Sequence, residues 1–500
     1  MDTTLFVWMV AIPILAAPVI YLLGRLGVQQ EILPQRSKLV RWAAFTATLA
    51  TWIPFIFTVR DFLSQRHGQF HIESIWLEVD GLSLLMSFIV LLLGTIVILF
   101  SGSYMAGEIG EEKYYVMLLV MVGVMIGLSC ATDLFNLWIW FEAMAVSSYL
   151  LVAFYRRQPA SLEAGMKYLV QSAVGSVLVL VGIAAVLAQA KTLTLSQIRE
   201  VATASPILLA AGALFIVGFG VKIAIVPMHT WLPDAHAQAP SGISAMLSGI
   251  VIEIGLLALL RTLLALAGVT RAWCFLLMGF GALNMIYGNL MALRQNQVKR
   301  LLAYSSLSHI GYILFGLGIA FYSHQGIGAS GAFFHILNHG VMKGLAFLAA
   351  GTLLYAIKLS RGNHEPLLIS DLAGAASRYP LPSLALSVAL LGLGGLPPLA
   401  GFMSKWQIFT AGFATHNGVI MCLVVFAALN SVLSLAYYAP MVNIMYRTKP
   451  GAGTPENSMI PITMLIPLGI LACLVILLGL WPGFMDWIIQ PASQSFLIGF

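Results

Sequence analysis

The sequence predicts an all-α, polytopic membrane protein with about 14 transmembrane helices. Sixty per cent of the 500 residues are hydrophobic and only 9% are charged, and the mean hydropathy is +0.94. A soluble domain is closer to half apolar and about a quarter charged. The apolar runs also recur at membrane-spanning length, which one large soluble core would not require. Lipid is therefore the expected solvent for most of the surface.

Neither the positive charge nor the cysteines indicate a binding function. The net charge is +6, but the basic residues are scattered among short loops and form no stripe for nucleic acid. All four cysteines lie in apolar runs without CxxC or Cys/His spacing, so we expect packing residues rather than disulfides, zinc ligands or iron–sulfur ligands: Cys130, Cys274, Cys422 and Cys473. The first apolar run, Leu5 to Leu23, lacks a basic leader region and a cleavage site, which favours a retained first helix.

Each transmembrane helix needs about 20 predominantly apolar residues. This rule predicts helices over residues 3–24, 39–58, 81–103, 114–131, 133–154, 163–189, 206–228, 241–260, 273–292, 300–322, 327–356, 381–413, 417–446 and 460–483.

The loops between these helices differ in charge. Odd-numbered loops hold fifteen of the 25 Lys and Arg residues, including Arg25, Arg36, Lys38, Arg41, Arg156, Arg157, Arg294, Lys299 and Arg300. Even-numbered loops hold six: Arg60, Arg66, Lys191, Arg199, Arg261 and Arg271. The positive-inside rule then places the odd loops in the cytoplasm and both termini on the opposite side.

Two predicted helices are interrupted at comparable places. The segment Val217–Pro227 contains two glycines, a proline and Lys222, and the segment Leu391–Lys405 contains several glycines, two prolines and Lys405. They are the seventh and twelfth helices, five helices apart. Paired interruptions of this kind are typical of transporters with inverted repeats, whose site lies at the breaks. Pro and Gly are also common in ordinary membrane helices, but a Lys in both segments favours the repeat.

Eight ionisable residues inside predicted helices are the candidate site for proton translocation. A charge at the bilayer centre costs about 2.5–3.5 kcal/mol on insertion scales, so such residues usually face a partner or water and mark an ion pathway. A static ion pair or a snorkelling side chain would produce the same pattern. The candidates are Glu142, Lys222, Glu253, His309, His335, His339, Lys343 and Lys405.

The chemistry of these residues suits proton transfer. Desolvation disfavours the charged form of carboxylates and amines alike, whereas a nearby opposite charge restores it, so a Lys/Glu pair is a switchable proton site. His335, His339 and Lys343 recur at i, i+4 and i+8, which places them on one helix face as a relay. Histidines bonded to a neighbouring helix would show the same spacing. Asp133 and Asp234 lie near helix ends and are expected to be caps or interface residues.

Cofactor chemistry finds no support in the sequence. There is no P-loop, no GxGxxG motif after a strand and no HExxH motif. We therefore expect no cofactor and no metal in this chain, so iron–sulfur, flavin or quinone groups would belong to partner subunits.

Three segments resemble the antiporter-like, proton-translocating subunits of respiratory complex I. They are Val226–Ala245, with Pro-Met-His-Thr-Trp-Leu-Pro-Asp-Ala-His at its start, then Lys299–Tyr312, then Pro397–Lys405. The same family includes subunits of multisubunit Na⁺/H⁺ (Mrp) antiporters and of membrane-bound hydrogenases. The resemblance spans roughly residues 80–445 and rests on several separate motifs.

The resemblance implies fourteen helices with two inverted five-helix repeats and broken helices 7 and 12. The repeats would divide the chain into residues 1–112, 113–260, 261–446 and 447–500. It also implies a hydrophilic axis, in which Glu142 pairs with Lys222 and the axis continues over helices eight to eleven to Lys405. The chain ends soon after helix fourteen, which points to a member of the M, N or D type.

One residue departs from the family pattern. Glu253 stands where the family commonly carries Lys, in the context Gly249-Ile-Val-Ile-Glu-Ile-Gly. We expect this reversal of charge beside Lys222 to give that Lys a second carboxylate, with Glu253 replacing the usual Lys in the relay. The alternatives are a Glu253 that pairs with a base of a neighbouring subunit, or a coupling subunit that conducts no ion.

The resemblance favours a proton- or Na⁺-translocating subunit of a complex I-like NADH or ferredoxin:quinone oxidoreductase. It would be a non-redox subunit among other membrane subunits, including related antiporter-like ones, in a bacterial or archaeal inner membrane. The alternatives are the equivalent subunit of a membrane-bound hydrogenase, a subunit of an Mrp antiporter, or a structural spacer between neighbouring subunits.

Overall fold

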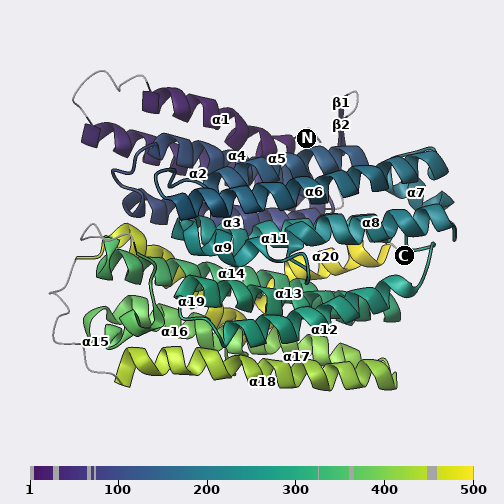
Figure 1. Cartoon of the computed structure of the whole chain (residues 1–500). Coiled ribbons are helices and arrows are strands. Elements are labelled where there is room, and N and C mark those ends of the chain that lie inside the picture. The colour runs from purple at the N-terminus through teal and green to yellow at the C-terminus, as the bar shows by residue number, and fades with distance from the viewer. Residues whose placement is uncertain are drawn as a thin grey trace.

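Long apolar helices run side by side through the molecule (Figure 1). The computed structural model describes residues 5–25, 33–64, 69–72, 75–324, 326–359, 365–447 and 459–498. Within these ranges, 13 helices are long and apolar enough to cross a membrane. The remaining predicted span, 381–413, is divided into two shorter helices. The multi-pass, all-α architecture predicted from the sequence is therefore confirmed.

The chain from the N-terminus to the middle of the molecule forms the first spans. These are α1 (Val7–Arg25), α2 (Leu33–Leu63), α3 (Gly81–Tyr104), α4 (Glu111–Ser129), α5 (Leu134–Val152), α6 (Pro159–Ala190), α8 (Pro206–Ile223) and the continuous segment of α10 (Ser241–Met246), the π-helix η1 (Leu247–Val251) and α11 (Ile252–Ala265). The later spans are α12 (Ala272–Ala292), α13 (Val298–Ser323), α14 (Gly326–Ile357), α16 (Pro380–Gly394), α17 (Ala400–Phe413), α18 (Gly418–Arg447) and α19 (Ile462–Leu480).

Several short elements were not predicted. They are the antiparallel strands β1 (Gln69–Ile72) and β2 (Ile75–Glu78), with α7 (Leu195–Val201), α9 (Trp231–Gln238), η3 (Ile369–Leu372), α15 (Ala375–Arg378), η4 (Pro482–Met485) and α20 (Asp486–Ile498). The last of these corrects the expectation of a plain tail after helix fourteen. Phe496 of α20 packs its ring against Phe321 and Phe333. Apolar packing, rather than membrane crossing, holds this helix in place.

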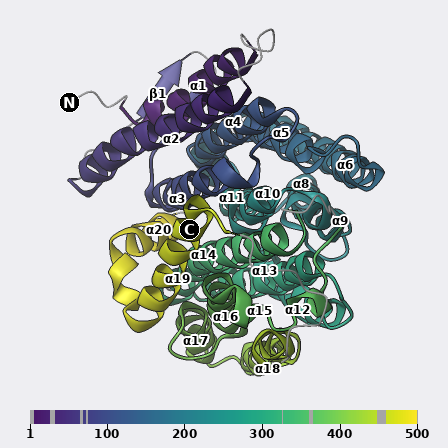
Figure 2. The ribbon, with the colours of Figure 1, turned by 90° about the vertical axis from the view of Figure 1, so that its left-hand side faces the viewer.

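Central and peripheral helices differ in burial. Viewed along the bundle, α11, α13 and α14 lie in the middle, whereas α1, α2, α6 and α18 lie at the edges (Figure 2). The segment α10–η1–α11 and helix α13 are buried along their full membrane window. The edge helices instead expose an apolar face, as at Leu15, Val174 and Val432. Ionisable residues on the central helices are therefore removed from lipid by the protein itself.

Both predicted interruptions are present. Helix α8 ends at Ile223 and the chain turns at Ala224, with φ of 60°, before α9 continues the span. Helix α16 ends at Gly394, the chain turns at Gly395, with φ of 80°, and α17 resumes at Ala400. The positive φ at Gly395 suits glycine, because larger residues rarely adopt it.

Two other sequence-based assignments are wrong. Cys422 and Cys473 are exposed on the bundle surface and do not pack in the interior, unlike the buried Cys130 and Cys274, and all four are free. Arg261 was counted as a loop residue but lies inside α11, where its Nη2 donates to Asp80 Oδ1 at 2.9 Å.

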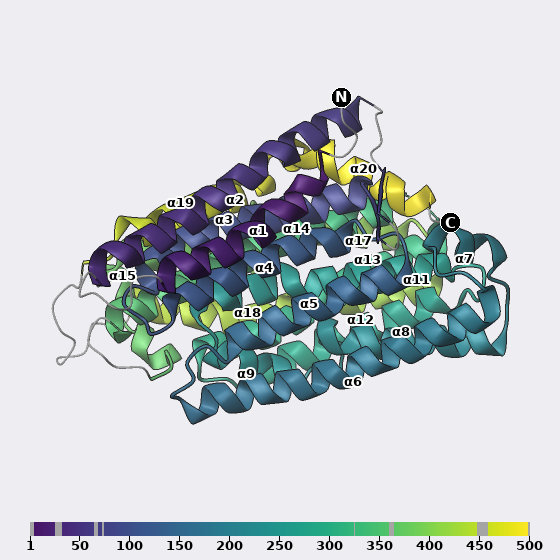
Figure 3. The ribbon, with the colours of Figure 1, turned by 90° about the horizontal axis from the view of Figure 1, so that it is seen from above.

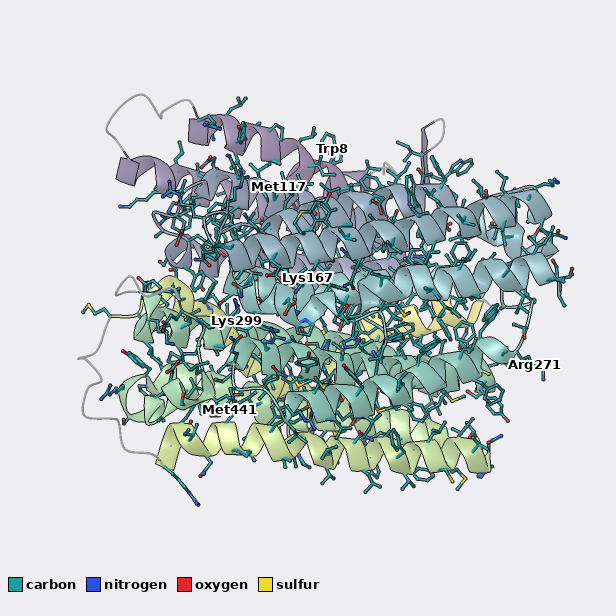
Figure 4. All side chains as sticks on the ribbon, viewed as in Figure 1. Trp8, Met117, Lys167, Arg271, Lys299 and Met441 are labelled. Carbon is teal, nitrogen blue, oxygen red and sulfur yellow. The ribbon has the colours of Figure 1, made fainter. Side chains whose placement is uncertain are left out.

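The predicted alternation of the loops can be followed in the structure. Figure 4 shows Arg271 at one end of the bundle and Lys299 toward the other, so α12 crosses between them. Lys299 is nevertheless buried, because it lies in the first turn of α13 rather than in a loop. Among the predicted loop residues, Arg66 and the side chain of Arg36 fall outside the described residues.

Candidate functional site

Lys222 is buried in the first half of the molecule at the end of α8. Its Nζ donates to Ser148 Oγ of α5 at 2.9 Å and to Tyr168 OH of α6 at 2.5 Å. The ammonium also lies 4.7 Å from the centre of the Tyr168 ring. Cation–π attraction and the negative end of the α8 dipole both offset the cost of burying this charge.

The surrounding sequence explains how this contact forms. Helices α6 and α8 approach closely where Gly175 and Gly218 meet, since a Cβ on Gly218 would lie 2.7 Å from Gly175 O. Tyr168 is held flat by Trp231 of α9, with ring centres 3.8 Å apart and planes 3° from parallel. Two glycines and one aromatic stack therefore aim the hydroxyl of Tyr168 at Lys222.

Glu142 of α5 does not form a direct ion pair with Lys222, although the resemblance implied that the two residues pair. No ion pair within 4.0 Å joins Lys222 to any carboxylate among the described residues. Glu142 nevertheless acts on Lys222 electrostatically, and its Oε1 is buried without a hydrogen-bond partner. The two residues are coupled through their charges rather than through a contact.

Glu253 faces the centre of the molecule and is fully buried. Its Oε1 lies 2.6 Å from His339 Nδ1 of α14. It does not pair with Lys222, contrary to our expectation. Gly255 of the same helix is the residue beside Lys222, since a Cβ on Gly255 would lie 3.1 Å from Lys222 Cγ. Residues two positions apart on a helix face different directions. Glu253 therefore points away from Lys222 and toward the second half of the molecule.

Local backbone geometry brings Glu253 and His339 together. The π-helix η1 comes directly before Ile252, and π-helical turns of this kind often occur at functional sites. Close to it, Gly249 and Gly340 meet, because a Cβ on Gly340 would lie 2.7 Å from Gly249 O. This contact sets α11 and α14 close enough for the Glu253–His339 hydrogen bond. Glu253 Oε2 and His339 Nε2 remain buried without a partner.

Two further histidine rings continue from this pair. His309 of α13 stacks on His339 at 5.2 Å and on His335 at 5.3 Å between ring centres. His309 Nδ1 lies 3.1 Å from His335 Nε2, and His335 Nδ1 lies 2.8 Å from Ser404 Oγ of α17. The predicted relay of His335 and His339 on one helix face is thus extended by His309 from the next helix.

Lys405 follows Ser404 and is buried at the second break. Its Nζ donates to Leu393 O at 3.0 Å and to Ser431 Oγ at 2.9 Å. The ammonium lies 4.6 Å from the centre of the Tyr312 ring. Leu393 is in the last turn of α16, so the ammonium meets the negative end of that helix dipole. A Cβ on Gly401 would lie 2.0 Å from Gly392 O, so glycine permits this approach.

Lys343 lies one turn beyond His339 on α14. Its Nζ donates to Leu302 O at 2.8 Å and to the hydroxyl of Ser305. Ser305 in turn is hydrogen-bonded to the hydroxyl of Tyr438 of α18. Lys343 therefore joins a hydroxyl network at the side of the histidines rather than an ion pair.

The structure divides the predicted residues into two groups. Hydrogen bonds, ring stacking or sequence adjacency link five of them around α14: Glu253, His309, His335, His339 and Lys405. Lys343 lies one turn from His339 on the same helix. Lys222 and Glu142 form the other group, with no direct hydrogen bond to the first among the described residues.

Sequence reasoning missed His236 of α9. This residue is fully buried, its ring stacks on Phe347 at 4.8 Å, and neither ring nitrogen has a hydrogen-bond partner. Lys299 is also part of the interior and donates to Ala239 O at 2.5 Å. The signal for His236 was present, because it stands in the Val226–Ala245 segment that carries the resemblance, in a helix that was not predicted.

The two aspartates near helix ends behave as expected. Asp133 is the N-cap of α5 and accepts from Phe135 N and Asn136 N. Asp234 pairs with Lys167 at 2.9 Å and with Arg300 at 2.8 Å. Both therefore have structural partners that account for their positions.

Fold and site together define a multi-pass membrane protein with two interrupted helices and a buried row of ionisable groups between them. Comparison with known proteins narrows this class. Residues 131–431 match the family described as NADH:quinone oxidoreductase/Mrp antiporter, TM. Residues 66–115 match the family described as NADH-Ubiquinone oxidoreductase (complex I), chain 5 N-terminus. The chain belongs to the NADH:quinone oxidoreductase/Mrp antiporter family of membrane subunits.

Individual relatives agree with this assignment. The F(420)H(2) dehydrogenase subunit N of Methanosarcina mazei is 34% identical over 88% of this chain and 89% of its own length. Hydrogenase-4 component B of Escherichia coli is 30% identical over 85% of this chain and 65% of its own length. A chain of the membrane-bound sulfane sulfur reductase, an archaeal respiratory membrane complex, aligns with a TM-score of 0.87 at 26% identity, covering 99% of this chain and 98% of that one.

Proposed function

We propose that the chain is the proton-translocating membrane subunit of a complex I-like oxidoreductase, in which redox energy drives protons along the buried row. The observation that carries this proposal is the sequence of contacts from Glu253 through His339, His309 and His335 to Ser404, the neighbour of Lys405. Hydrogen bonds join Glu253 to His339, His309 to His335 and His335 to Ser404, and ring stacking joins His339 to His309, so the row connects α11 to the second break.

The site residues favour protons over Na⁺ as the ion. Hard cations such as Na⁺ are held by several oxygen ligands, as Ca²⁺ and Mg²⁺ are. The row instead offers imidazole nitrogens and ammonium groups, which suit proton exchange near neutral pH. Glu253 contributes the one carboxylate of this row. Its hydrogen bond to His339 places a carboxylate and an imidazole side by side, and each of these groups can carry a proton.

The match in length supports a redox-driven complex of the subunit N type. This chain corresponds to 89% of the F(420)H(2) dehydrogenase subunit N, but to 65% of hydrogenase-4 component B. We assign iron–sulfur, flavin and quinone groups to partner subunits, since none of the motifs that hold them occurs in this sequence. Other membrane subunits, including related antiporter-like ones, would flank this chain.

The membrane and its sides follow from the charge of the loops. The odd-numbered loops carry most of the Lys and Arg residues, which favours the cytoplasmic side of a bacterial or archaeal inner membrane. Both chain termini would then face the non-cytoplasmic side.

The test is to purify the native complex, identify its chains and reconstitute it in proteoliposomes. On addition of its electron donor, a pH-sensitive dye should report proton movement, whereas ²²Na⁺ should not accumulate. Ion exchange without any electron donor would instead support a stand-alone antiporter, and a NiFe subunit in the complex would support a hydrogenase. Normal pumping by complexes that lack Lys222 and Lys405 would identify the chain as a spacer.

A further inference from the structure

A cavity outside the buried row is lined by α1, α4, α5 and the loop that leads into α6. It encloses about 690 Å³. Its lining combines apolar residues, Met117 and Leu151 among them, with the basic residues Lys113, Arg156 and Arg157. The proposed proton row uses none of these side chains.

The position of the cavity corresponds to the headgroup region of a bilayer. Its lining residues come from the ends of spans, because α4 begins at Glu111, α5 ends at Val152 and α6 begins at Pro159. Met117 and Lys299 are labelled in Figure 4 in the same half of the bundle, where α4, α5 and α6 meet at their ends (Figure 3). By the charge of the loops, this is the cytoplasmic side.

The charge of the lining is complementary to an anion. Three basic side chains face one acidic one, Glu108. Arg156 and Arg157 are exposed, and neither guanidinium has a hydrogen bond or ion pair to another described residue. The nearby Glu111 does not offset them, because it is paired with Arg41 at 2.5 Å. Two free guanidiniums at one rim provide the planar donors that bind phosphate well.

The apolar part of the cavity continues toward the bilayer interior. Val116 and Met117 lie in the second turn of α4, and Leu150 and Leu151 lie in the last turn of α5. Leu150 is 45% exposed, so this wall is open to lipid. Tyr21 adds an aromatic side chain of the kind enriched at membrane interfaces. A free phosphate would leave this apolar wall uncovered, whereas a phospholipid would cover it with its acyl chains.

We propose that this cavity binds an anionic phospholipid, with its phosphate at Arg156 and Arg157 and its acyl chains along Met117, Leu150 and Leu151. Basic pockets between transmembrane helices on the cytoplasmic side are suited to such headgroups. The lipid would fill the opening between α1, α4 and α5.

The test is native mass spectrometry of the full-length chain with phosphatidylglycerol and phosphatidylcholine. Each Arg near a headgroup strengthens binding by roughly fivefold, so Arg156→Gln together with Arg157→Gln should weaken phosphatidylglycerol binding by about 25-fold. The matched control is Arg294→Gln with Arg447→Gln, which removes the same charge from exposed positions elsewhere. It should bind phosphatidylglycerol as the unchanged chain does.

A second variant keeps the charge and changes the apolar wall. Leu150→Trp should fill part of the cavity and also reduce phosphatidylglycerol binding, with both arginines in place. The proposal is overturned if the site variant and the control lose binding equally, if phosphatidylcholine binds as well as phosphatidylglycerol, or if an excess of inorganic phosphate displaces the lipid completely.

Discussion

The two halves of the molecule bury a lysine at each interrupted helix, and the two environments are built alike. Lys222 donates to two hydroxyls and lies 4.7 Å from the centre of the Tyr168 ring. Lys405 donates to a hydroxyl and a backbone carbonyl and lies 4.6 Å from the centre of the Tyr312 ring. Neither ammonium contacts a carboxylate among the described residues. Both are therefore held by dipoles and aromatic rings, which stabilise the charge without fixing it in an ion pair.

The two lysines differ in what lies next to them. Lys405 adjoins Ser404, which is hydrogen-bonded to His335 and so to the histidine row. Among the described residues, Lys222 has no neighbour that is hydrogen-bonded to the histidine row. Glu253 lies between the two halves but points toward His339 rather than toward Lys222. The residues of the second half are thus linked by hydrogen bonds and ring stacking, whereas in the first half Glu142 acts on Lys222 through its charge. No hydrogen bond among the described residues joins Lys222 or Glu142 to the row.

Loss of Lys405 should reduce proton translocation more than any other change in either half. Lys405→Ala removes the group at the end of the row, and we expect proton translocation to fall by about a hundredfold. Lys405→Arg should fall nearly as far, because the guanidinium cannot release its proton. Dye quenching by reconstituted complexes measures both. Near-normal pumping in the Arg variant would reassign Lys405 to a static electrostatic role.

Changes in the first half should separate Lys222 from Glu142. Lys222→Ala should stop most translocation while the complex still assembles, because it removes the buried ammonium at the first break. Glu142→Gln should lower it by about tenfold, since the two residues interact without a direct contact. The same proteoliposome assay applies, with assembly checked by native gel. Full pumping by an assembled Lys222→Ala complex would remove the first half from the pathway.

Breaking the link between His335 and Lys405 should reduce proton translocation less than removing either lysine. Ser404→Ala removes the hydroxyl that His335 contacts, and a rate loss of about threefold to tenfold is expected from one hydrogen bond. Ser383→Ala is the matched control, because the Ser383 hydroxyl is also buried but has no partner among the described residues. Equal rates for the two variants would mean that Ser404 lies outside the route.

The stability of the second break should be sensitive to a single methyl group added at Gly401. Gly401→Ala places a Cβ only 2.0 Å from Gly392 O, so it should lower stability by about 1–3 kcal/mol. Gly469→Ala should change stability far less, because nothing lies within 4 Å of its added Cβ. Thermal unfolding in detergent compares them. Matching melting temperatures would show that the break does not depend on close packing there.

The sequence predicted the spans and the breaks well, because each depends on local composition. Apolar runs of the required length and the clusters around Lys222 and Lys405 are visible without any contact information. The direction in which a side chain points cannot be seen without that contact information. Glu253 was expected beside Lys222, but its direction depends on the π-turn of η1 and on the contact of Gly249 with Gly340. Neither feature has a local signature.

Short elements were missed for a related reason. Helices α9 and α20 are held by packing against distant parts of the chain, such as Trp231 on Tyr168 and Phe496 on Phe321. His236 stayed outside the predicted site because its helix was not predicted. Cys422 and Cys473 were assigned to the interior because an apolar run in a membrane protein faces lipid as readily as protein.

The proposed proton row begins at Glu253, and the ratio of protons moved to electrons transferred in Glu253→Gln complexes tests most directly whether the row carries protons. The Gln variant keeps the shape of the side chain but cannot carry a proton. Glu200→Gln, at an exposed position, is the matched control. We expect the ratio of protons to electrons to fall sharply in Glu253→Gln complexes while electron transfer continues, and we expect the ratio in the control to stay normal. An unchanged ratio in an assembled Glu253→Gln complex would contradict it.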